Sequence, residues 1–155
     1  MNALKLESKL KAGTDRIEVW KEISNAWRQI TREAEKNLSG LGLCTTEFKI
    51  LKILDNDGPT PMARLSDATM LSQPAITSFV DKLEAQGFVK RDRDNEDRRV
   101  IRIEITKKGQ LLFRRGLKIH TKFVRELLSG IDDEELTQFT QTIKKLSSVE
   151  VRVVK

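Results

Sequence analysis

The period of the hydrophobic pattern changes twice along this chain, and that change limits the folds it can adopt. Up to Gly87, apolar residues recur every three or four positions, which is typical of amphipathic helices. Residues 100–105 instead alternate between apolar and charged side chains, which indicates a strand with one buried face. The helical spacing returns from Thr106. Together with residues 88–91 and the charged stretch 92–99, this pattern predicts one β-hairpin with a charged tip, set between helices.

Helical signals on both sides of the hairpin predict a mainly α fold with the element order ααααββαα. Turn formers at residues 55–58 and the glycine at Gly87 end two of the helices, and Thr106 caps the helix that follows the hairpin. The predicted helices cover residues 17–41, 48–54, 62–68, 72–87 and 106–129, with a last one that opens at residues 132–135.

Composition excludes several classes of protein. The 155 residues carry a net charge of +6, which favours a polyanionic partner. Cys44 is the only cysteine, so no intrachain disulfide can form, and no apolar run approaches the ~18 residues of a membrane span. We therefore expect a cytoplasmic protein. One histidine, no tyrosine and no metal-ligand cluster, catalytic triad or phosphate-binding glycine loop argue against an enzyme, a metal site or a cofactor.

Residues 59–105 have the order helix, short turn, helix, hairpin, which is that of a winged helix-turn-helix. The second helix is then the recognition helix. With its apolar residues buried, it presents short polar side chains that can reach base edges in a major groove, while Ser72 and the free N–H groups at the helix start can meet a phosphate. The alternative is an ordinary solvated helix. The predicted DNA-binding residues here are Ser72, Gln73, Pro74, Thr77 and Ser78.

The hairpin, or wing, must supply much of the electrostatic affinity, because residues 61–88 have a net charge of −1. Arginines in the hairpin can pair with phosphate or enter a minor groove. Acids lie among them, so a self-paired, solvated hairpin is the alternative. We expect a divided role, in which Asp97 holds an arginine that braces the wing and the others face DNA. The predicted DNA-binding arginines are Arg91, Arg98 and Arg99.

Several motifs together closely resemble the MarR family (multiple-antibiotic-resistance regulators). They are Leu71-Ser72-Gln73-Pro74-Ala75-Ile76-Thr77, Val80-Asp81-Lys82-Leu83-Glu84, Gly87-Phe88-Val89, Asp94-Asn95-Glu96-Asp97-Arg98-Arg99 and Ile105-Thr106-Lys107-Lys108-Gly109. The resemblance implies a homodimer with one winged domain per protomer on a pseudo-palindromic operator. It implies an N-terminal dimerisation helix in residues 1–42, a DNA-binding domain in 43–105 and C-terminal dimerisation helices in 106–155.

Apolar stripes on the terminal helices support the dimer independently, because a small winged core cannot cover them alone. The alternative is that these helices fold back on their own chain. The candidates for a shared core are Trp20, Leu127, Leu128, Phe139, Ile143 and Leu146.

Many family members bind small aromatic or lipophilic anions in a crevice between the dimerisation helices and the winged domain. The resemblance therefore suggests such an effector here. Trp27 and Arg28 are our candidates for its site, an aromatic face beside a cation. The alternatives are a core position for Trp27 and a surface position for Arg28.

Three further features stay open at the level of sequence. Cys44 precedes a helix, where a thiol can have a lowered pKa and sense oxidants, although a small buried residue is the other interpretation. His120 has no second metal ligand at helical spacing, which favours a packing or surface role. The basic run from Lys107 to Arg125 contains no acid. It either extends the field felt by DNA or forms a solvated face.

The sequence thus predicts a sequence-specific regulator that binds double-stranded DNA as a homodimer and acts as a repressor. The alternatives are a winged helix used for protein interaction and a non-specific architectural DNA-binding module. The architectural module would bind its own upstream DNA and random DNA with nearly equal affinity.

Overall fold

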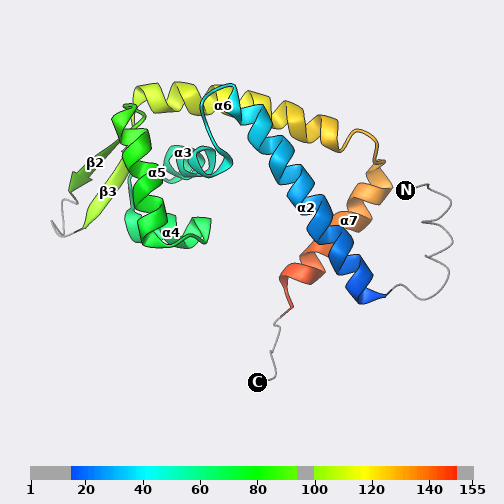
Figure 1. Cartoon of the computed structure of the whole chain (residues 1–155). Helices are drawn as coiled ribbons and strands as arrows, with labels where there is room; N and C mark the ends of the chain where they lie inside the picture. Colours follow the sequence, from blue (N-terminus) through cyan, green and yellow to red (C-terminus); the bar gives the residue numbers. More distant parts are fainter. Residues whose placement is uncertain (1–14, 94–99, 150–155) are drawn as a thin grey trace, which may run out of the picture. The chain divides into compact units, whose positions relative to one another are not determined.

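The computed structural model describes residues 15–93 and 100–149, which belong to two compact units that divide within one helix between His120 and Thr121. Figure 1 shows the elements. They are α2 (Arg16–Ser39), α3 (Thr45–Asp57), β1 (Thr60–Pro61), α4 (Met62–Thr69), α5 (Gln73–Ala85), β2 (Val89–Arg93), β3 (Ile101–Ile105), α6 (Lys107–Leu127) and α7 (Asp133–Ser147). The predicted mainly α fold with a small hairpin is confirmed.

The sheet has one strand more than the sequence predicts. Its order is β1-β3-β2, and both pairs are antiparallel. Strand β1 is only two residues long, so it has no alternation by which it could be recognised, and Thr60 pairs with Ile103. The predicted alternation in β3 holds at Ile103 and Ile105, which are buried, but Ile101 is 46% exposed. Ile101 pairs with Arg93 at the far end of the hairpin. There the wing extends beyond the core.

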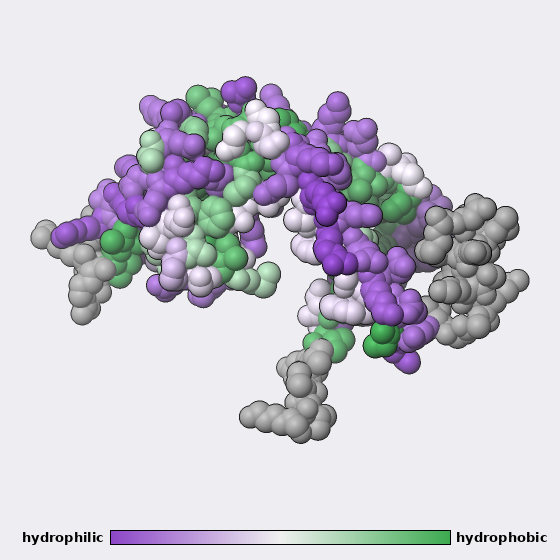
Figure 2. Space-filling model, in the orientation of Figure 1, coloured by the Kyte–Doolittle hydropathy of each residue, from purple (hydrophilic) through white to green (hydrophobic). Residues whose placement is uncertain are grey.

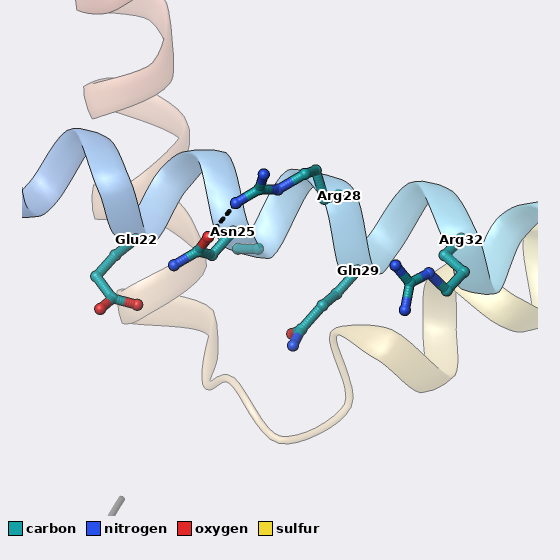
Figure 3. A pocket seen from close by; sticks show the side chains of 6 residues that line it. Glu22, Asn25, Arg28, Gln29 and Arg32 are labelled. Carbon is teal, nitrogen blue, oxygen red and sulfur yellow. Dashed lines mark hydrogen bonds between the residues drawn. The ribbon is translucent and has the colours of Figure 1, made fainter.

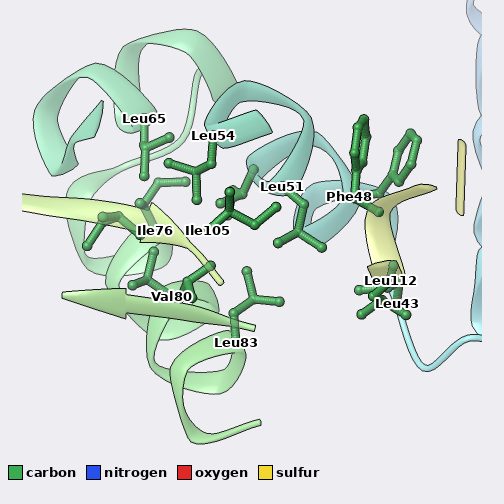
Figure 4. Packing of buried hydrophobic residues seen from close by; sticks show 14 of the residues in the cluster. Leu43, Phe48, Leu51, Leu54, Leu65, Ile76, Val80, Leu83, Ile105 and Leu112 are labelled. Atoms are coloured by element: carbon green, nitrogen blue, oxygen red, sulfur yellow. The ribbon is translucent and has the colours of Figure 1, made fainter. Parts of the chain in front are cut away.

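A single hydrophobic core holds the first unit together. Figure 4 shows side chains of α3, α4, α5 and β3 converging on it, with Leu51 and Leu54 of α3 at its centre. Leu65 of α4 lies at one edge of the cluster, and Ile105 of β3 lies between Ile76 and Leu51. Burying one such side chain contributes about 1.5–3 kcal/mol. The core therefore fixes the helix-turn-helix and the root of the wing as one body.

Helix α2 joins this core only through its C-terminal part. Its buried residues are Ala34 and Leu38. The carboxylate of Glu35 accepts a 2.7 Å hydrogen bond from the Thr45 N–H, which ties α2 to the start of α3. Trp20 is 66% exposed and Trp27 69% exposed. The core position considered for Trp27 is therefore wrong for the single chain.

The second unit also exposes apolar side chains. Helix α7 begins with a capping box between Asp132 and Glu135 and has no buried residue. Phe139, Ile143 and Leu146 lie exposed along it. The space-filling view shows hydrophobic surface at the ends of α2 and α7 (Figure 2). None of the helices in the described ranges combines the length and the apolar character needed to cross a membrane.

Candidate nucleic-acid interface

The turn between α4 and α5 is fixed by hydrogen bonds across it. The Ser66 hydroxyl donates to the Leu71 carbonyl at 2.5 Å, and the Leu71 N–H donates back to the Ser66 carbonyl at 3.3 Å. Met70 stands between them with φ +59°, in the left-handed region that non-glycine residues seldom adopt. The turn reverses the chain in three residues. It sets α5 across α4, as a helix-turn-helix requires.

Helix α5 has the two faces that the sequence predicts. Ile76, Val80 and Leu83 are completely buried. The opposite side is exposed at every predicted DNA-binding position on this helix, namely Ser72, Gln73, Pro74, Thr77 and Ser78. These side chains are therefore brought together on one open surface. Whether they contact DNA stays a prediction.

The start of α5 differs in one detail from the expected cap. Ser72 occupies the N-cap with extended backbone, and its carbonyl accepts the Ile76 N–H at 3.0 Å, but its side chain makes no capping hydrogen bond. The Thr77 hydroxyl donates to the Gln73 carbonyl at 2.9 Å. Its oxygen lone pairs stay open to an incoming donor. Pro74 has no N–H group, but the N–H groups of Gln73 and Ala75 at the start of the helix are available to an anion.

The other end of α5 is clamped to the start of α6. Gly87, at φ +74°, closes the helix because its N–H donates to Glu84 and the next N–H, of Phe88, donates to Leu83. The Thr106 hydroxyl then donates to the Gly87 carbonyl at 2.8 Å and accepts the Gly109 N–H at 3.1 Å, so Thr106 caps α6 as predicted.

Two further residues complete this clamp. The Lys108 ammonium donates to the Gln86 carbonyl at 2.7 Å and lies 4.9 Å from the centre of the Phe88 ring. Gly109 packs so closely that a Cβ there would lie 2.0 Å from the Phe88 carbonyl oxygen. The Ile-Thr-Lys-Lys-Gly motif thus fixes the end of the recognition helix and the root of the wing.

Arg91 joins the wing to the recognition helix. Its guanidinium forms ion pairs with Asp81, at 2.5 Å, and with Glu84, and its N–H donates to Glu84 at 2.9 Å. Partial burial opposes the charge, but the two α5 carboxylates outweigh it and raise the pKa of Arg91. Arg91 is thus engaged within the chain rather than extended into solvent. No sequence pattern indicates this, because the three residues meet only when the hairpin packs on α5.

The rest of the predicted wing site falls outside the described residues. Asp97, Arg98 and Arg99 all lie in the stretch 94–99. At the root of the wing, the cross-strand pair Lys90–Glu104 forms a 2.8 Å ion pair. Whether the wing arginines pair with the acids among them or face DNA stays a prediction.

An ion pair between a buried carboxylate and a half-exposed lysine joins α5 to α3. Glu47 is fully buried, and one carboxylate oxygen lies 2.7 Å from the Lys82 ammonium. Its other oxygen accepts the Cys44 N–H at 2.8 Å, while the Cys44 thiol accepts the Glu47 N–H at 3.4 Å. The hydrogen bond and charge of Glu47 raise the pKa of Lys82. Burial raises the pKa of the Cys44 thiol. The lowered pKa considered for a redox role at Cys44 is therefore wrong.

The candidate effector residues lie on α2. Figure 3 shows a pocket whose lining side chains all come from this helix, and in it the Arg28 guanidinium donates to the Asn25 side-chain oxygen at 2.5 Å. Trp27 is exposed on the same helix but does not line this pocket. The lining residues are Glu22, Asn25, Ala26, Arg28, Gln29 and Arg32. Effector binding stays a prediction.

His120 has a packing role. Its ring centre lies 5.3 Å from that of Phe48 in the core. Burial, and then the charge of Lys52, lower the pKa of His120. Among residues 15–93 and 100–149, no three His, Cys, Asp or Glu side chains are grouped as a metal site requires.

Known proteins with this architecture regulate transcription. A model of the MarR family matches residues 43–101. The HTH-type transcriptional regulator MhqR of Bacillus subtilis is 32% identical over 124 residues, which are 80% of this chain and 86% of MhqR.

Two solved structures share the fold. The transcriptional regulator BldR of Sulfolobus solfataricus is 31% identical, with a TM-score of 0.73, over 96% of this chain and 100% of BldR. A mutant of MarR from E. coli, solved in complex with operator DNA, is 20% identical, with a TM-score of 0.77, over 86% of this chain and 99% of that one.

These relatives are transcriptional regulators, so the expectation that the chain is not an enzyme is confirmed. The motifs, the winged helix-turn-helix and the identity to MhqR agree, and the chain belongs to the MarR family of transcriptional regulators, which bind DNA.

Proposed function

We propose that the protein acts as a homodimeric repressor that occupies a pseudo-palindromic operator in double-stranded DNA. The exposed polar face of α5 carries this proposal. It combines an open helix N-terminus with short side chains that fit a major groove, on a helix held rigidly at both ends. Residues 43–105 would form the DNA-binding domain, and residues 1–42 and 106–155 the dimerisation helices.

The residues would divide the work of recognition. Gln73, Pro74, Thr77 and Ser78 would read base edges, and Ser72 with the N–H groups at the start of α5 would meet a phosphate. In the wing, Arg98 and Arg99 would contact phosphates or a minor groove, with Asp97 bracing one arginine. Because the α5 carboxylates hold Arg91, we assign it to bracing the wing rather than to contacting DNA.

Exposed apolar side chains support the homodimer. Trp20 on α2 and Phe139 on α7 are 66% and 57% exposed, and neighbours at helical spacing are exposed with them. Stripes of this kind on a chain rich in charge mark an association surface. A two-fold dimer would offer one α5 to each of two successive major grooves. The fold shared with MarR of E. coli, which was solved on operator DNA, agrees with this arrangement.

We further propose that a small aromatic or lipophilic anion releases the protein from DNA, and that the protein acts in the cytoplasm. Arg28 supplies a cation on α2 and Trp27 an exposed aromatic face one residue away. Such a ligand would lower the affinity for DNA if it bound more tightly to a dimer in which the spacing of the two recognition helices does not fit the operator. The largest possible effect is set by the difference in ligand affinity between the two conformations.

The test is binding of the purified protein to the DNA upstream of its own gene, against random duplex of equal length, over a salt series. Preference for the upstream DNA, with a steep salt slope, is expected. Gln73→Ala or Thr77→Ala should change the sequence preference, whereas Arg98→Ala or Arg99→Ala should weaken binding to all sequences. Equal binding to both duplexes would indicate an architectural protein. Lack of DNA binding would favour a protein-interaction module.

A further inference from the structure

Helix α6 presents a basic face where it belongs to the first unit. Four cations point to solvent along it, while Leu112, Phe113 and Gly116 on its other side are buried. We call these four residues the α6 basic face: Lys107, Arg114, Arg115 and Lys118.

The charge on this face differs from that of an ordinary solvated helix. On α2, cations are paired with acids one turn away, as in Lys21–Glu18 at 2.8 Å and Lys36–Glu33 at 2.6 Å. No acid occurs between Lys107 and Arg125. None of the four side chains of the α6 basic face forms an ion pair with another residue of the described ranges.

This arrangement costs folding free energy. Like charges four residues apart, such as Arg114 and Lys118, repel each other and destabilise a helix. Lys107 in the first turn also opposes the helix dipole, and that turn holds no acid. No ion pair with another residue of the described ranges relieves this repulsion. An anionic partner would relieve it.

The α6 basic face is separate from the DNA-reading face of α5. The buried side of α6 packs against Phe48 of α3, since a Cβ on Gly116 would lie 3.1 Å from the Phe48 ring, whereas α5 packs on the core through Ile76 and Val80. Helix α6 runs along one edge of the first unit, away from α4 (Figure 1). Around α5 and the wing root, by contrast, the cations Lys82, Lys90 and Arg91 are already paired with acids.

We propose that the α6 basic face binds the phosphate backbone of a second DNA duplex, so that a molecule bound to its operator also holds another segment of DNA. A row of cations on a rigid helix suits a regular line of phosphates, and the guanidinium groups of Arg114 and Arg115 can each bind phosphate with two hydrogen bonds. Release of counterions from the duplex drives such binding without sequence preference. The inference goes beyond operator recognition and uses a different surface.

A bridging experiment tests this. Upstream DNA is fixed on beads and saturated with the full-length protein, and a fluorescent random duplex is then added over a salt series. The wild type should capture the second duplex. Arg114→Gln/Lys118→Gln should lose most of this capture, and its log–log salt slope should fall by about 1.8, since each cation removed contributes about 0.9. The amount of protein on the beads should not change.

Matched variants make the result specific. Lys144→Gln/Lys145→Gln, on exposed positions of α7, removes the same charge and should capture the second duplex like the wild type. Arg114→Gln/Lys118→Gln should also melt no lower than the wild type, because it removes repulsion and glutamine is a good helix former. Failure of operator recognition would show instead as equal binding of the protein to beads that carry upstream DNA and to beads that carry random duplex.

Three outcomes would overturn the inference. One is that the wild type captures no second duplex. If it binds poly-glutamate instead, the α6 basic face would be assigned to an acidic protein partner, and the inference would be overturned all the same. Another is capture by Arg114→Gln/Lys118→Gln at the wild-type level. The third is capture abolished by Gln73→Ala/Thr77→Ala with protein still on the beads, which would assign the bridging to the recognition helices.

Discussion

The guanidinium of Arg91 in the wing lies 2.5 Å from the carboxylate of Asp81 on the recognition helix. With Glu84 as a second partner, this contact makes β2 and α5 one rigid piece. Its single positive charge also offsets one of the two negative charges that Asp81 and Glu84 place on a helix that we expect to approach phosphates. We therefore expect Arg91 to support DNA binding by holding the wing on α5, without touching DNA itself.

Replacing Arg91 should affect stability and DNA binding together. Arg91→Met keeps an unbranched apolar stem but leaves Asp81 and Glu84 without their cation. We expect the free energy of unfolding to fall by about 1 kcal/mol and the affinity for DNA to fall as well. A double-mutant cycle with Asp81→Asn, measured by urea denaturation, should give a coupling energy of about 0.5–1 kcal/mol. If the losses of stability in Arg91→Met and Asp81→Asn were strictly additive, the ion pair would not hold the wing on α5.

The clamp at the end of the recognition helix should not tolerate a side chain at Gly109. In Gly109→Ala the new Cβ would lie 2.0 Å from a backbone oxygen and 2.9 Å from Ile105, so the backbone must move. We expect a loss of about 1–3 kcal/mol in the free energy of unfolding, measured by urea denaturation.

Gly40→Ala is the matched control for that variant. Gly40 has φ −61° and no atom within 4 Å of a Cβ position, so alanine fits there without strain. It should leave stability unchanged or raise it by about 0.4–1 kcal/mol. Equal losses in the two variants would show that close packing at Gly109 is not the cause.

Substitutions of Glu47 and Lys82, which form the ion pair between α3 and α5, should lower the free energy of unfolding by unequal amounts. Lys82→Met leaves the fully buried Glu47 carboxylate without its cation and should cost about 1–3 kcal/mol. Glu47→Gln removes the charge, and the Lys82 side chain, 53% exposed, can turn to water. Glu47→Gln should therefore lower the free energy of unfolding by less than Lys82→Met does. Chemical denaturation of both variants checks the order, and a larger loss in Glu47→Gln would contradict it.

The features that follow from local rules could be predicted from the sequence. The two faces of α5 follow from its helical spacing, and the roles of Gly87 and Thr106 follow from cap chemistry that depends only on neighbouring residues. Strand β1 could not be predicted, because two residues carry no period.

The contacts that depend on tertiary packing could not be predicted either. Arg91 meets Asp81 across ten residues of sequence, and Glu47 pairs with Lys82 on another helix. In the sequence, Glu47 is a capping residue and Arg91 one basic residue of a charged hairpin. Only the fold shows that Glu47 is buried and that Arg91 is paired with carboxylates of α5. Helix α6 is the reverse case, since its unbalanced charge is plain in the sequence but its exposure is not.

His120 should make stability depend on pH near neutrality. Its pKa is lowered in the folded protein, by burial and by the charge of Lys52, while in the unfolded chain it is about 6.5. Between these two values the unfolded state binds more protons. The stabilising contribution is therefore complete above about pH 6.5, falls as the pH drops below it, and levels off below the folded-state pKa. His120→Gln should remove this part of the slope. Urea denaturation of both proteins between about pH 8 and pH 5 measures it. Parallel pH profiles would mean that another group is responsible.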